Sequence, residues 1–163
     1  MAETAAKTTA EAADDTGRSA TIPADLAESL GFLTRAVHLQ ERDHIRSGGS
    51  AALPFATYSA LAVIAANPGI RQRTLADLLQ VQESNMANLT RKLVDEGYVE
   101  RRKTGTKRGL GLSLTPEGAR VLADARPVMH ALDRDFAAAL PPADYADLVS
   151  LLTRVMLSRL GSR

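Results

Sequence analysis

The chain has 163 residues, of which 45% are hydrophobic and only 4% aromatic, with a net charge of +1 at pH 7. This length suits about one domain, and the absence of cysteine excludes disulfides, thiol sensing and thiolate metal sites. No apolar run approaches the roughly 20 residues of a membrane span, and the first residues lack a secretory hydrophobic core, so we expect a cytoplasmic protein with no membrane partner.

The N-terminal segment is rich in small and acidic residues. The first thirty residues hold two bases and six acids, a net charge of −4. Such a composition buries too little apolar surface to fold alone. Residues 1–20 are therefore predicted to be a disordered tail, which could order only against a partner.

Two helices are predicted next. The first runs from about Ala24 to Ser47 and ends at Gly48-Gly49, and the second runs from about Pro54 to Ala66 and ends at Asn67-Pro68-Gly69. One face of the first helix is apolar and holds Leu26, Leu30, Leu33, Val37 and His44, while the opposite face holds Arg35, His38, Arg42 and Arg46. Because His44 lies on the apolar face, we interpret it as a buried, hydrogen-bonded histidine.

Residues 74–95 predict a short helix, a tight turn and a second helix, with Ala76 allowing the two helices to cross closely. Their shared core is predicted to contain Leu75, Leu78, Val81, Met86, Leu89 and Leu93. The other side of the second helix carries Ser84, Asn88, Arg91 and Asp95, flanked by Asn85 and Lys92. Short hydrogen-bonding side chains and cations suit contacts to base edges and phosphates. A solvated face is the alternative for an isolated helix, and the neighbouring elements favour DNA binding.

A hairpin with a basic tip follows this second helix. Val99–Arg102 and Leu110–Leu114 alternate as half-buried strands do. Seven Lys or Arg and three acids lie between Arg91 and Arg108, so this segment carries +4. Helix, turn, helix and hairpin in this order predict a winged helix-turn-helix whose second helix enters the major groove. The local basic patch, rather than the net charge, supports nucleic-acid binding.

Two long helices complete the chain. Thr115-Pro116 suits the start of the first, Pro127 is predicted to kink or open it, and Leu140-Pro141-Pro142 ends it. Its apolar stripe is Leu122, Ala125, Met129, Leu132 and Phe136, and the last helix presents Tyr145, Leu148, Leu152, Val155 and Met156. These helices and the first one are more apolar than one small domain can bury. A homodimer is therefore predicted, with a monomer as the alternative, and paired recognition helices would meet an inverted repeat with half-sites about one helical turn apart.

The expected fold is mainly α with a small β-hairpin wing: a winged helix-turn-helix plus a helical dimerisation region. Four segments are predicted. Residues 1–20 are the tail, and residues 21–52 form an N-terminal helix for dimerisation and a ligand pocket. Residues 53–115 form the winged helix-turn-helix, and residues 116–163 form the C-terminal dimerisation helices.

Residues 75–118 resemble the MarR family of bacterial transcriptional regulators. The similarity rests on Leu75-Ala76, Leu78 or Leu79, Val81, Ser84, Met86, Leu89, Leu93 and Gly97-Tyr98-Val99-Glu100-Arg101-Arg102, and most specifically on Leu112-Ser-Leu-Thr-Pro-Glu-Gly118. It extends over roughly residues 25–160. The resemblance implies a homodimer, a winged helix-turn-helix in each subunit, and repression relieved by a small ligand.

The residues expected to contact double-stranded DNA lie on the second helix and in the wing. They are Ser84, Asn85, Ala87, Asn88, Arg91, Lys92, Arg101, Lys103, Lys107 and Arg108. The sequence departs from the family pattern at Thr106, where an Asp is usual, at Lys107, where an arginine is usual, and at Gln82, which replaces a Ser or Thr cap. Arg108 matches the residue expected to reach the minor groove.

The resemblance also implies an effector pocket between the dimerisation helices and the DNA-binding lobe. Here it would be formed by Phe32, Arg35, His38, Arg42, Phe55 and Tyr58. Aromatic walls with cationic anchors suit a small anionic aromatic compound or an acyl-CoA phosphate. The alternative, which the sequence leaves open, is that these cations only solvate the outer face of the first helix.

No catalytic residue, resident cofactor or metal site is predicted. The chain has no Gly-rich phosphate loop, HExxH or GxSxG motif. His38 and His44 are about 600° apart around a helix, so they are poor joint metal ligands. The remaining alternatives are a winged-helix module that binds proteins without an effector, and a small enzyme with an unrecognised site.

Overall fold

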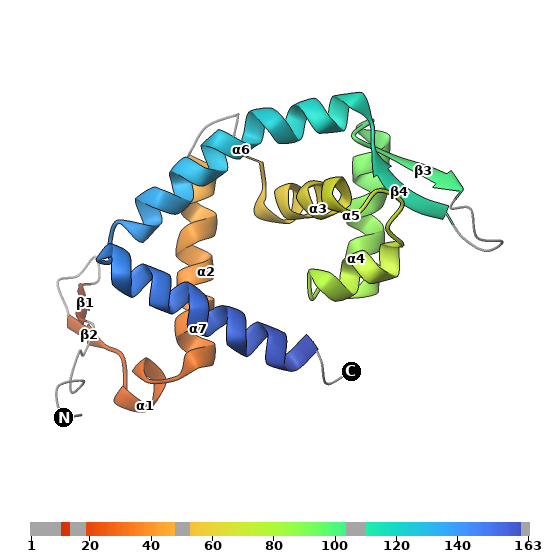
Figure 1. Cartoon of the computed structure of the whole chain (residues 1–163). Coiled ribbons are helices and arrows are strands. Elements are labelled where there is room, and N and C mark those ends of the chain that lie inside the picture. The colour runs from red at the N-terminus through yellow and green to blue at the C-terminus, as the bar shows by residue number, and fades with distance from the viewer. Residues whose placement is uncertain (1–10, 14–18, 48–52, 104–109, 161–163) are drawn as a thin grey trace. The chain divides into compact units, whose positions relative to one another are not determined.

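The computed structural model describes residues 11–13, 19–47, 53–103 and 110–160. It divides into two compact units, Met1–Asp43 and His44–Arg163, each described here by itself. The helices and strands are drawn in Figure 1. None of the described helices is both long enough and apolar enough to cross a membrane.

The first unit begins with two short strands. β1 (Glu11–Ala13) pairs antiparallel with β2 (Ser19–Thr21). β1 and most of β2 lie within residues 1–20, which the composition predicts to be disordered, so at these described positions the structure differs from that prediction. The pairing is local, and such a short hairpin adds little stability by itself.

The helix predicted from Ala24 to Ser47 is in fact two helices, α1 (Ala24–Ala27) and α2 (Leu30–Ser47). Ser29 provides the hydrogen bonds at the start of α2. Its carbonyl oxygen accepts from the Leu33 amide (2.9 Å) and its hydroxyl from the Phe32 amide (3.4 Å). A serine whose oxygen atoms accept from free backbone amides favours the start of a helix at that position. The apolar periodicity, which predicted one continuous helix, does not contain this capping signal.

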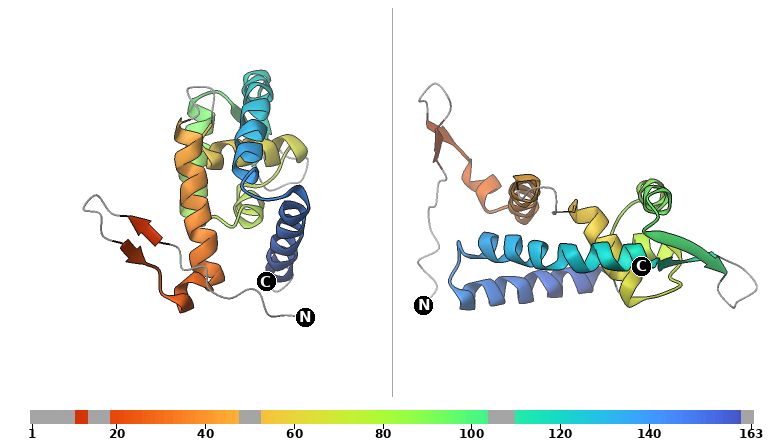
Figure 2. Two further views of the ribbon diagram at one scale, coloured as in Figure 1. Left: turned by 90° about the vertical axis from the view of Figure 1, so that its left-hand side faces the viewer. Right: turned by 90° about the horizontal axis from the view of Figure 1, so that it is seen from above.

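The second unit contains the elements expected of a winged helix-turn-helix. They are α3 (Phe55–Ala66), α4 (Gln72–Leu78), α5 (Glu83–Asp95), β3 (Val99–Lys103) and β4 (Leu110–Leu114). Two long helices follow, α6 (Pro116–Ala137) and α7 (Pro142–Leu160). Figure 2 shows β3 and β4 projecting away from α3, α4 and α5. The mainly helical fold with a hairpin wing is therefore as predicted.

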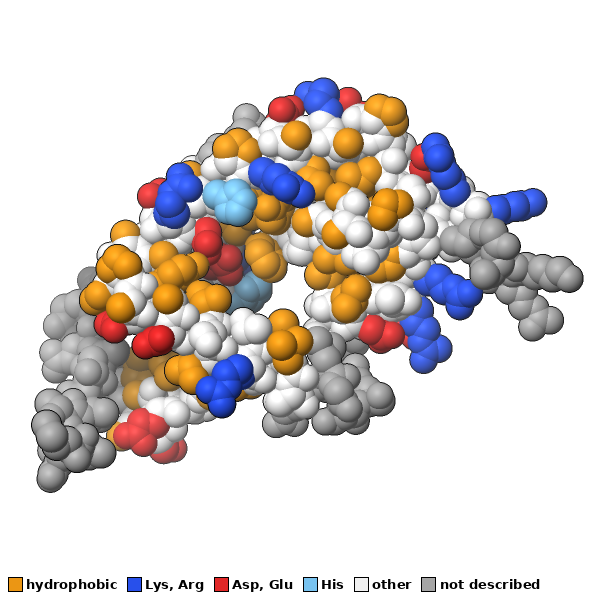
Figure 3. Space-filling view, viewed as in Figure 1, with side chains coloured by type: hydrophobic (Ala, Val, Ile, Leu, Met, Phe, Trp, Pro, Cys, Tyr) orange, Lys and Arg blue, Asp and Glu red, His pale blue; other side chains and the backbone are white. Residues whose placement is uncertain are grey.

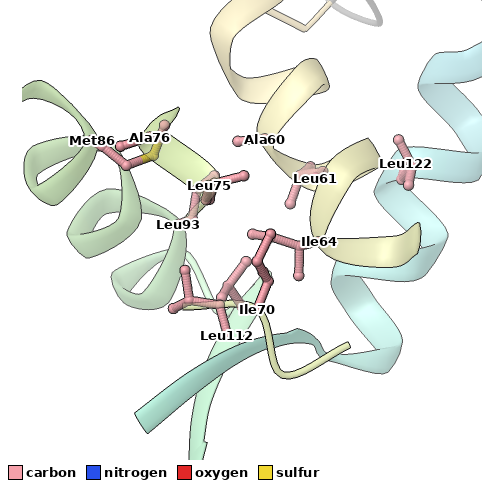
Figure 4. Packing of buried hydrophobic residues seen from close by; sticks show 11 residues of the cluster. Ala60, Leu61, Ile64, Ile70, Leu75, Ala76, Met86, Leu93, Leu112 and Leu122 are labelled. Atoms are coloured by element: carbon pink, nitrogen blue, oxygen red, sulfur yellow. The ribbon is translucent and has the colours of Figure 1, made fainter. Parts of the chain in front are cut away.

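One apolar core joins α3, α4, α5 and α6 to the wing (Figure 4). Its buried members include Ala60, Leu61, Ile64, Ile70, Leu75, Ala76, Met86, Leu93, Val99, Leu112 and Leu122. Val81 and Leu89 are half-buried against it, as expected. The prediction for Leu78 is wrong, because this side chain is 46% exposed. Leu79 packs instead, since it lies between Leu75 and Ala76 around the helix, whereas residue 78 lies about 60° beyond Leu75.

The wing is anchored to the segment between α3 and α4. β3 and β4 pair in a register that places Arg101 opposite Leu112 and Lys103 opposite Leu110. Ile70 forms a further antiparallel bridge with Leu112, where the Leu112 amide donates to the Ile70 carbonyl at 2.8 Å. The base of the hairpin therefore belongs to the core, while its far end extends outward.

α6 is continuous through Pro127, so the proline does not end the helix. Leu122, Ala125 and Met129 of its predicted stripe are buried. The side chain of Phe136 lies outside the described part of the chain. The hydroxyl of Tyr145 lies 3.2 Å from the Asp133 carboxylate, which links α7 to the last turns of α6.

Candidate nucleic-acid interface

α5 has two distinct faces, as the sequence predicts for a recognition helix. Met86, Thr90 and Leu93 are buried. The opposite surface is polar and exposed, with Ser84, Asn85, Asn88, Arg91 and Lys92. Ala87, also predicted to contact DNA, is half-buried at the edge of this surface. The structure therefore brings the predicted contact residues of this helix onto one accessible side.

The orientation of α5 depends on a buried polar contact that the sequence reading missed. The Thr90 hydroxyl donates to Oε1 of Gln72 on α4 at 2.8 Å, and it lies 2.9 Å from the Met86 carbonyl oxygen. Thr90 is fully buried, so losing its partner would leave a polar group unsatisfied. The contact fixes α5 against α4 next to the polar surface. The sequence holds one signal for this contact, which is a threonine among the apolar residues on the buried side of α5.

Two polar side chains on the exposed surface of α5 already touch. One terminal nitrogen of the Arg91 guanidinium donates to Oδ1 of Asn88 at 3.4 Å. An amide oxygen can accept two hydrogen bonds, so Asn88 keeps one acceptor site and both of its donors for a base edge. Arg91 therefore orients the side chain that is best suited to read adenine.

The start of α5 lacks the usual cap. Gln82 occupies the N-cap position and makes no side-chain hydrogen bond to the helix. The first helical residue, Glu83, instead lies near Arg73 of α4, with 3.4 Å between the Arg73 Nε and the Glu83 Oε1. Neither residue of this ion pair was among the predicted contact residues. A carboxylate in the first turn also complements the helix dipole.

The described part of the wing presents two of its predicted cations on one face. Arg101 and Lys103 are exposed and two residues apart, so they point to the same side of the strand. Arg102 points to the other side and pairs with Glu100 at 2.6 Å. Figure 3 shows Lys and Arg side chains protruding where α4, α5 and β3 lie. Thr106, Lys107 and Arg108 lie outside the described residues.

Thr115 ties the end of α5 to the start of α6. Its hydroxyl donates to the Gly97 carbonyl oxygen at 2.6 Å and accepts from the Gly118 amide at 3.0 Å. Gly97 has φ +75°, which favours glycine where a helix ends. Within the Leu-Ser-Leu-Thr-Pro-Glu-Gly segment, Thr115 and Gly118 therefore have a structural role, because they connect α5 to α6 at the base of the wing.

Ion pairs follow this joint along the exposed side of α6. Arg120 hydrogen-bonds to Glu117 at 2.6 Å and 3.0 Å and to Asp124 at 2.9 Å. The hydrogen bonds from Arg120 hold the pKa of the Glu117 carboxyl below its usual value, and those same bonds raise the pKa of Arg120. Both side chains are exposed, so this network makes a minor contribution to stability.

The residues proposed for an effector pocket fall in different units. Phe32, Arg35, His38 and Arg42 lie on the part of α2 within Met1–Asp43, whereas Phe55 and Tyr58 lie on α3 in His44–Arg163. On α2, Arg42 lies 3.6 Å from Asp43, and His38 lies 3.9 Å from Glu41. The pocket itself therefore stays a prediction.

His44 differs from its interpretation as a hydrogen-bonded histidine. Its Nε2 is buried, yet no described residue offers it a hydrogen-bond partner. The side chain as a whole is half-buried. Within the described segments, no three His, Asp or Glu side chains come together as a group that could hold a metal ion.

Comparisons with known proteins fit this geometry. A model of the MarR family matches residues 53–108, from the start of α3 into the wing. Residues 53–108 of this chain are therefore similar to the winged helix of the MarR family. A putative transcriptional regulatory protein for the hcr operon of Thauera aromatica is 34% identical over 99 residues, which are 60% of this chain and 60% of that relative. The match thus spans less than two thirds of the curated relative.

Solved structures extend the likeness to the rest of the fold. The transcriptional repressor CouR bound to a 23-mer DNA duplex has a TM-score of 0.71 and 26% identity, over 82% of this chain and 96% of that one. A MarR family protein of Mycobacterium tuberculosis in complex with salicylic acid has a TM-score of 0.63 and 26% identity, over 79% and 98%. The relatives and the MarR fold are those of transcriptional regulators rather than enzymes. The predicted family resemblance is confirmed.

Proposed function

We propose that this MarR-family protein is a sequence-specific regulator that binds double-stranded DNA through α5 and the wing, most simply as a ligand-responsive repressor. The observation that carries the proposal is the polar surface of α5, held rigidly by Thr90 and the core beside the exposed cations Arg101 and Lys103. The DNA-bound state of CouR, a protein of the same fold, supports it. Base contacts would come from Asn88 and Arg91, and phosphate contacts from the wing.

The apolar surfaces of α2 and α7 support a homodimer. On α2, Leu30, Leu33 and Val37 are exposed. On α7, the exposed large hydrophobic residues are Leu148, Val149, Leu151, Leu152, Val155, Met156 and Leu157. Contiguous apolar faces of this kind mark interaction surfaces. A second copy would cover them and would pair two recognition helices for an inverted repeat, with half-sites about one helical turn apart.

The proposed effector is a small anionic aromatic compound, free or as its CoA thioester, for which Arg35, His38 and Arg42 of α2 would be the cationic anchors. The salicylic acid complex of the Mycobacterium tuberculosis relative supports this ligand class. A ligand can change DNA binding only through a difference in its affinity for the two forms of the dimer.

A binding titration tests the proposed function directly. Fluorescence anisotropy would compare DNA from upstream of the protein's own gene with a scrambled duplex of equal length and composition, at a fixed salt concentration. We expect saturable binding of one dimer, with the upstream DNA preferred by at least about a thousandfold. Equal affinity for both duplexes would contradict sequence-specific regulation and would favour a winged helix that binds protein. Sedimentation of the full chain, with Leu152→Lys as a control, would test the dimer.

A further inference from the structure

We propose that Glu83 is a specificity-determining residue that accepts a hydrogen bond from a cytosine amino group, and that Arg73 is the positioning residue that makes this contact favourable. The inference rests on the proposed DNA binding. Glu83 is the first residue of α5, and Arg73 is the second residue of α4. Both side chains are exposed, at 67% and 80%, so both are accessible from solution.

The two helices place this ion pair between bases and phosphates. In a helix-turn-helix, the N-terminal residues of the recognition helix reach base edges, while the preceding helix crosses the DNA backbone. Glu83 therefore lies at the base-reading end of α5, and Arg73 lies on the helix that would face the phosphates. The 3.4 Å approach of Arg73 Nε to Glu83 Oε1 joins the two positions.

Arg73 counteracts the main cost of placing a carboxylate near DNA. An isolated negative charge there would be repelled by the phosphates, since nucleic-acid binding depends on cationic contacts. Arg73 meets Glu83 through Nε, and the two terminal nitrogens have no hydrogen-bond partner among the described residues. A guanidinium has five donors in a fixed fork. Arg73 can therefore neutralise Glu83 and bind a phosphate at the same time.

The chemistry of the carboxylate selects the base. An ionised carboxylate only accepts hydrogen bonds. In the major groove, guanine presents two acceptors and cytosine presents an amino donor, and Glu or Asp pairs with that amino group. Glu83 is therefore expected to favour cytosine at one position of each half-site and to disfavour guanine there.

The test measures base preference with duplexes that vary one base pair of the half-site at a time. Glu83→Gln keeps the size of the side chain and adds a donor, so we expect it to lose about tenfold of the discrimination between cytosine and guanine at one position. Glu96→Gln is the matched control, because Glu96 pairs with Lys92 (3.7 Å) at the far end of the same helix. It should leave base preference unchanged.

A thermodynamic cycle tests the role of Arg73. Arg73→Ala should weaken binding to every duplex, because it exposes an unneutralised carboxylate and removes a phosphate contact. The loss should be smaller when Glu83→Gln is already present, so that the two effects are not additive. Rescue by Arg73→Lys should restore affinity in part.

Two results would overturn the inference while leaving the proposed function intact. One is sequence-specific DNA binding by the Glu83→Gln variant with an unchanged base preference. This result would show that Glu83 only stabilises the start of α5, whether or not the thermal midpoint of unfolding falls. The other is strict additivity of the Arg73 and Glu83 changes. Absence of sequence-specific binding by the unaltered protein would instead refute the proposed function.

Discussion

The carbonyl oxygen of Tyr98 occupies the space that a side chain at Gly118 would need. A Cβ built at Gly118 would stand 2.0 Å from that oxygen and 2.8 Å from the carbonyl carbon. Tyr98 leads directly into β3, and Gly118 lies in the first turn of α6. The hydroxyl of Thr115 closes the same joint. The base of the wing and the start of α6 are therefore one rigid junction.

Gly118→Ala is expected to destabilise the protein by about 3 kcal/mol, because the new methyl group collides with backbone that cannot move as a side chain would. Helix propensity alone would give the opposite sign, since alanine is favoured over glycine by about 1 kcal/mol. Urea denaturation followed by circular dichroism would measure the change. Gly31→Ala is the matched control, because its Cβ would meet only Ser29 Oγ at 3.9 Å. Equal effects of the two changes would refute the rigid junction.

Thr90→Val should destabilise the protein by about 1–3 kcal/mol although the two side chains have nearly the same shape, because it removes the partner of the Gln72 amide. DNA affinity should also fall, since α5 loses a contact that fixes it to α4. The measurements are chemical denaturation and anisotropy. Thr74→Val, at an exposed position of α4, should change stability by less than about 0.5 kcal/mol. A stable Thr90→Val protein would show that packing alone orients α5.

Asn88→Ala and Arg91→Ala should each reduce the free energy of specific DNA binding by about 1–3 kcal/mol, because both side chains project from the exposed polar surface of α5 that is proposed to contact bases. Their hydrogen bond makes the losses non-additive, and Asn88→Ala should relax base preference at one position. Competition binding with variant half-sites measures both effects. Arg126→Ala on α6 removes a comparable charge and should have little effect. Unchanged affinity in the double variant would exclude α5 as the reading helix.

Much of this architecture could be predicted from the sequence, because local residue patterns determine the helix boundaries and the strands of the wing. Pro116 and Thr115 mark the start of α6, and Asn67-Pro68-Gly69 marks the end of α3. The polar side of α5 also follows from spacing alone. Apolar periodicity fails where burial depends on partners elsewhere in the chain, as at Leu78, which is exposed while its neighbour Leu79 packs against the core.

Contacts between side chains of different helices could not be predicted in the same way. Neither the Thr90–Gln72 hydrogen bond nor the Arg73–Glu83 ion pair leaves a periodic trace, because each joins α4 to α5 across the turn. Ser29 did carry a local signal, since serine is a favourable helix start. It was overridden by the uninterrupted apolar stripe from Leu26 to Val37.

The wing should contribute affinity with little base specificity. Arg101→Ala is expected to weaken binding to all operators about equally and to lower the slope of log affinity against log salt by about one per subunit, because an exposed cation is lost from a phosphate contact. Arg108→Ala, at a position outside the described residues, should do the same. Arg102→Ala is the control, since Arg102 lies on the opposite face and pairs with Glu100. A loss of sequence preference with an unchanged salt slope would contradict this role.

The effector proposal makes a final prediction about α2. Isothermal titration of small aromatic acids and their CoA thioesters should detect binding to the unaltered protein, and Arg42→Ala should weaken it at least tenfold, because a charge-assisted anchor is removed. Arg42 is 55% exposed and its Asp43 partner is 3.6 Å away, so this pair can open at little cost. A bound acid should also release DNA, and a tenfold loss of DNA affinity needs only about 1.4 kcal/mol of coupling.

Arg46→Ala is the matched control for Arg42→Ala, since Arg46 is an exposed arginine one turn further along α2 and outside the proposed pocket. It should leave acid binding unchanged. Equal weakening by the two changes would indicate a diffuse effect of net charge, and equal binding by Arg42→Ala and the unaltered protein would show that the cations only solvate α2. Because ligand and DNA affinities are linked reciprocally, adding operator DNA should weaken acid binding by the same factor. Acid binding that does not respond to operator DNA would separate the ligand site from the regulatory switch.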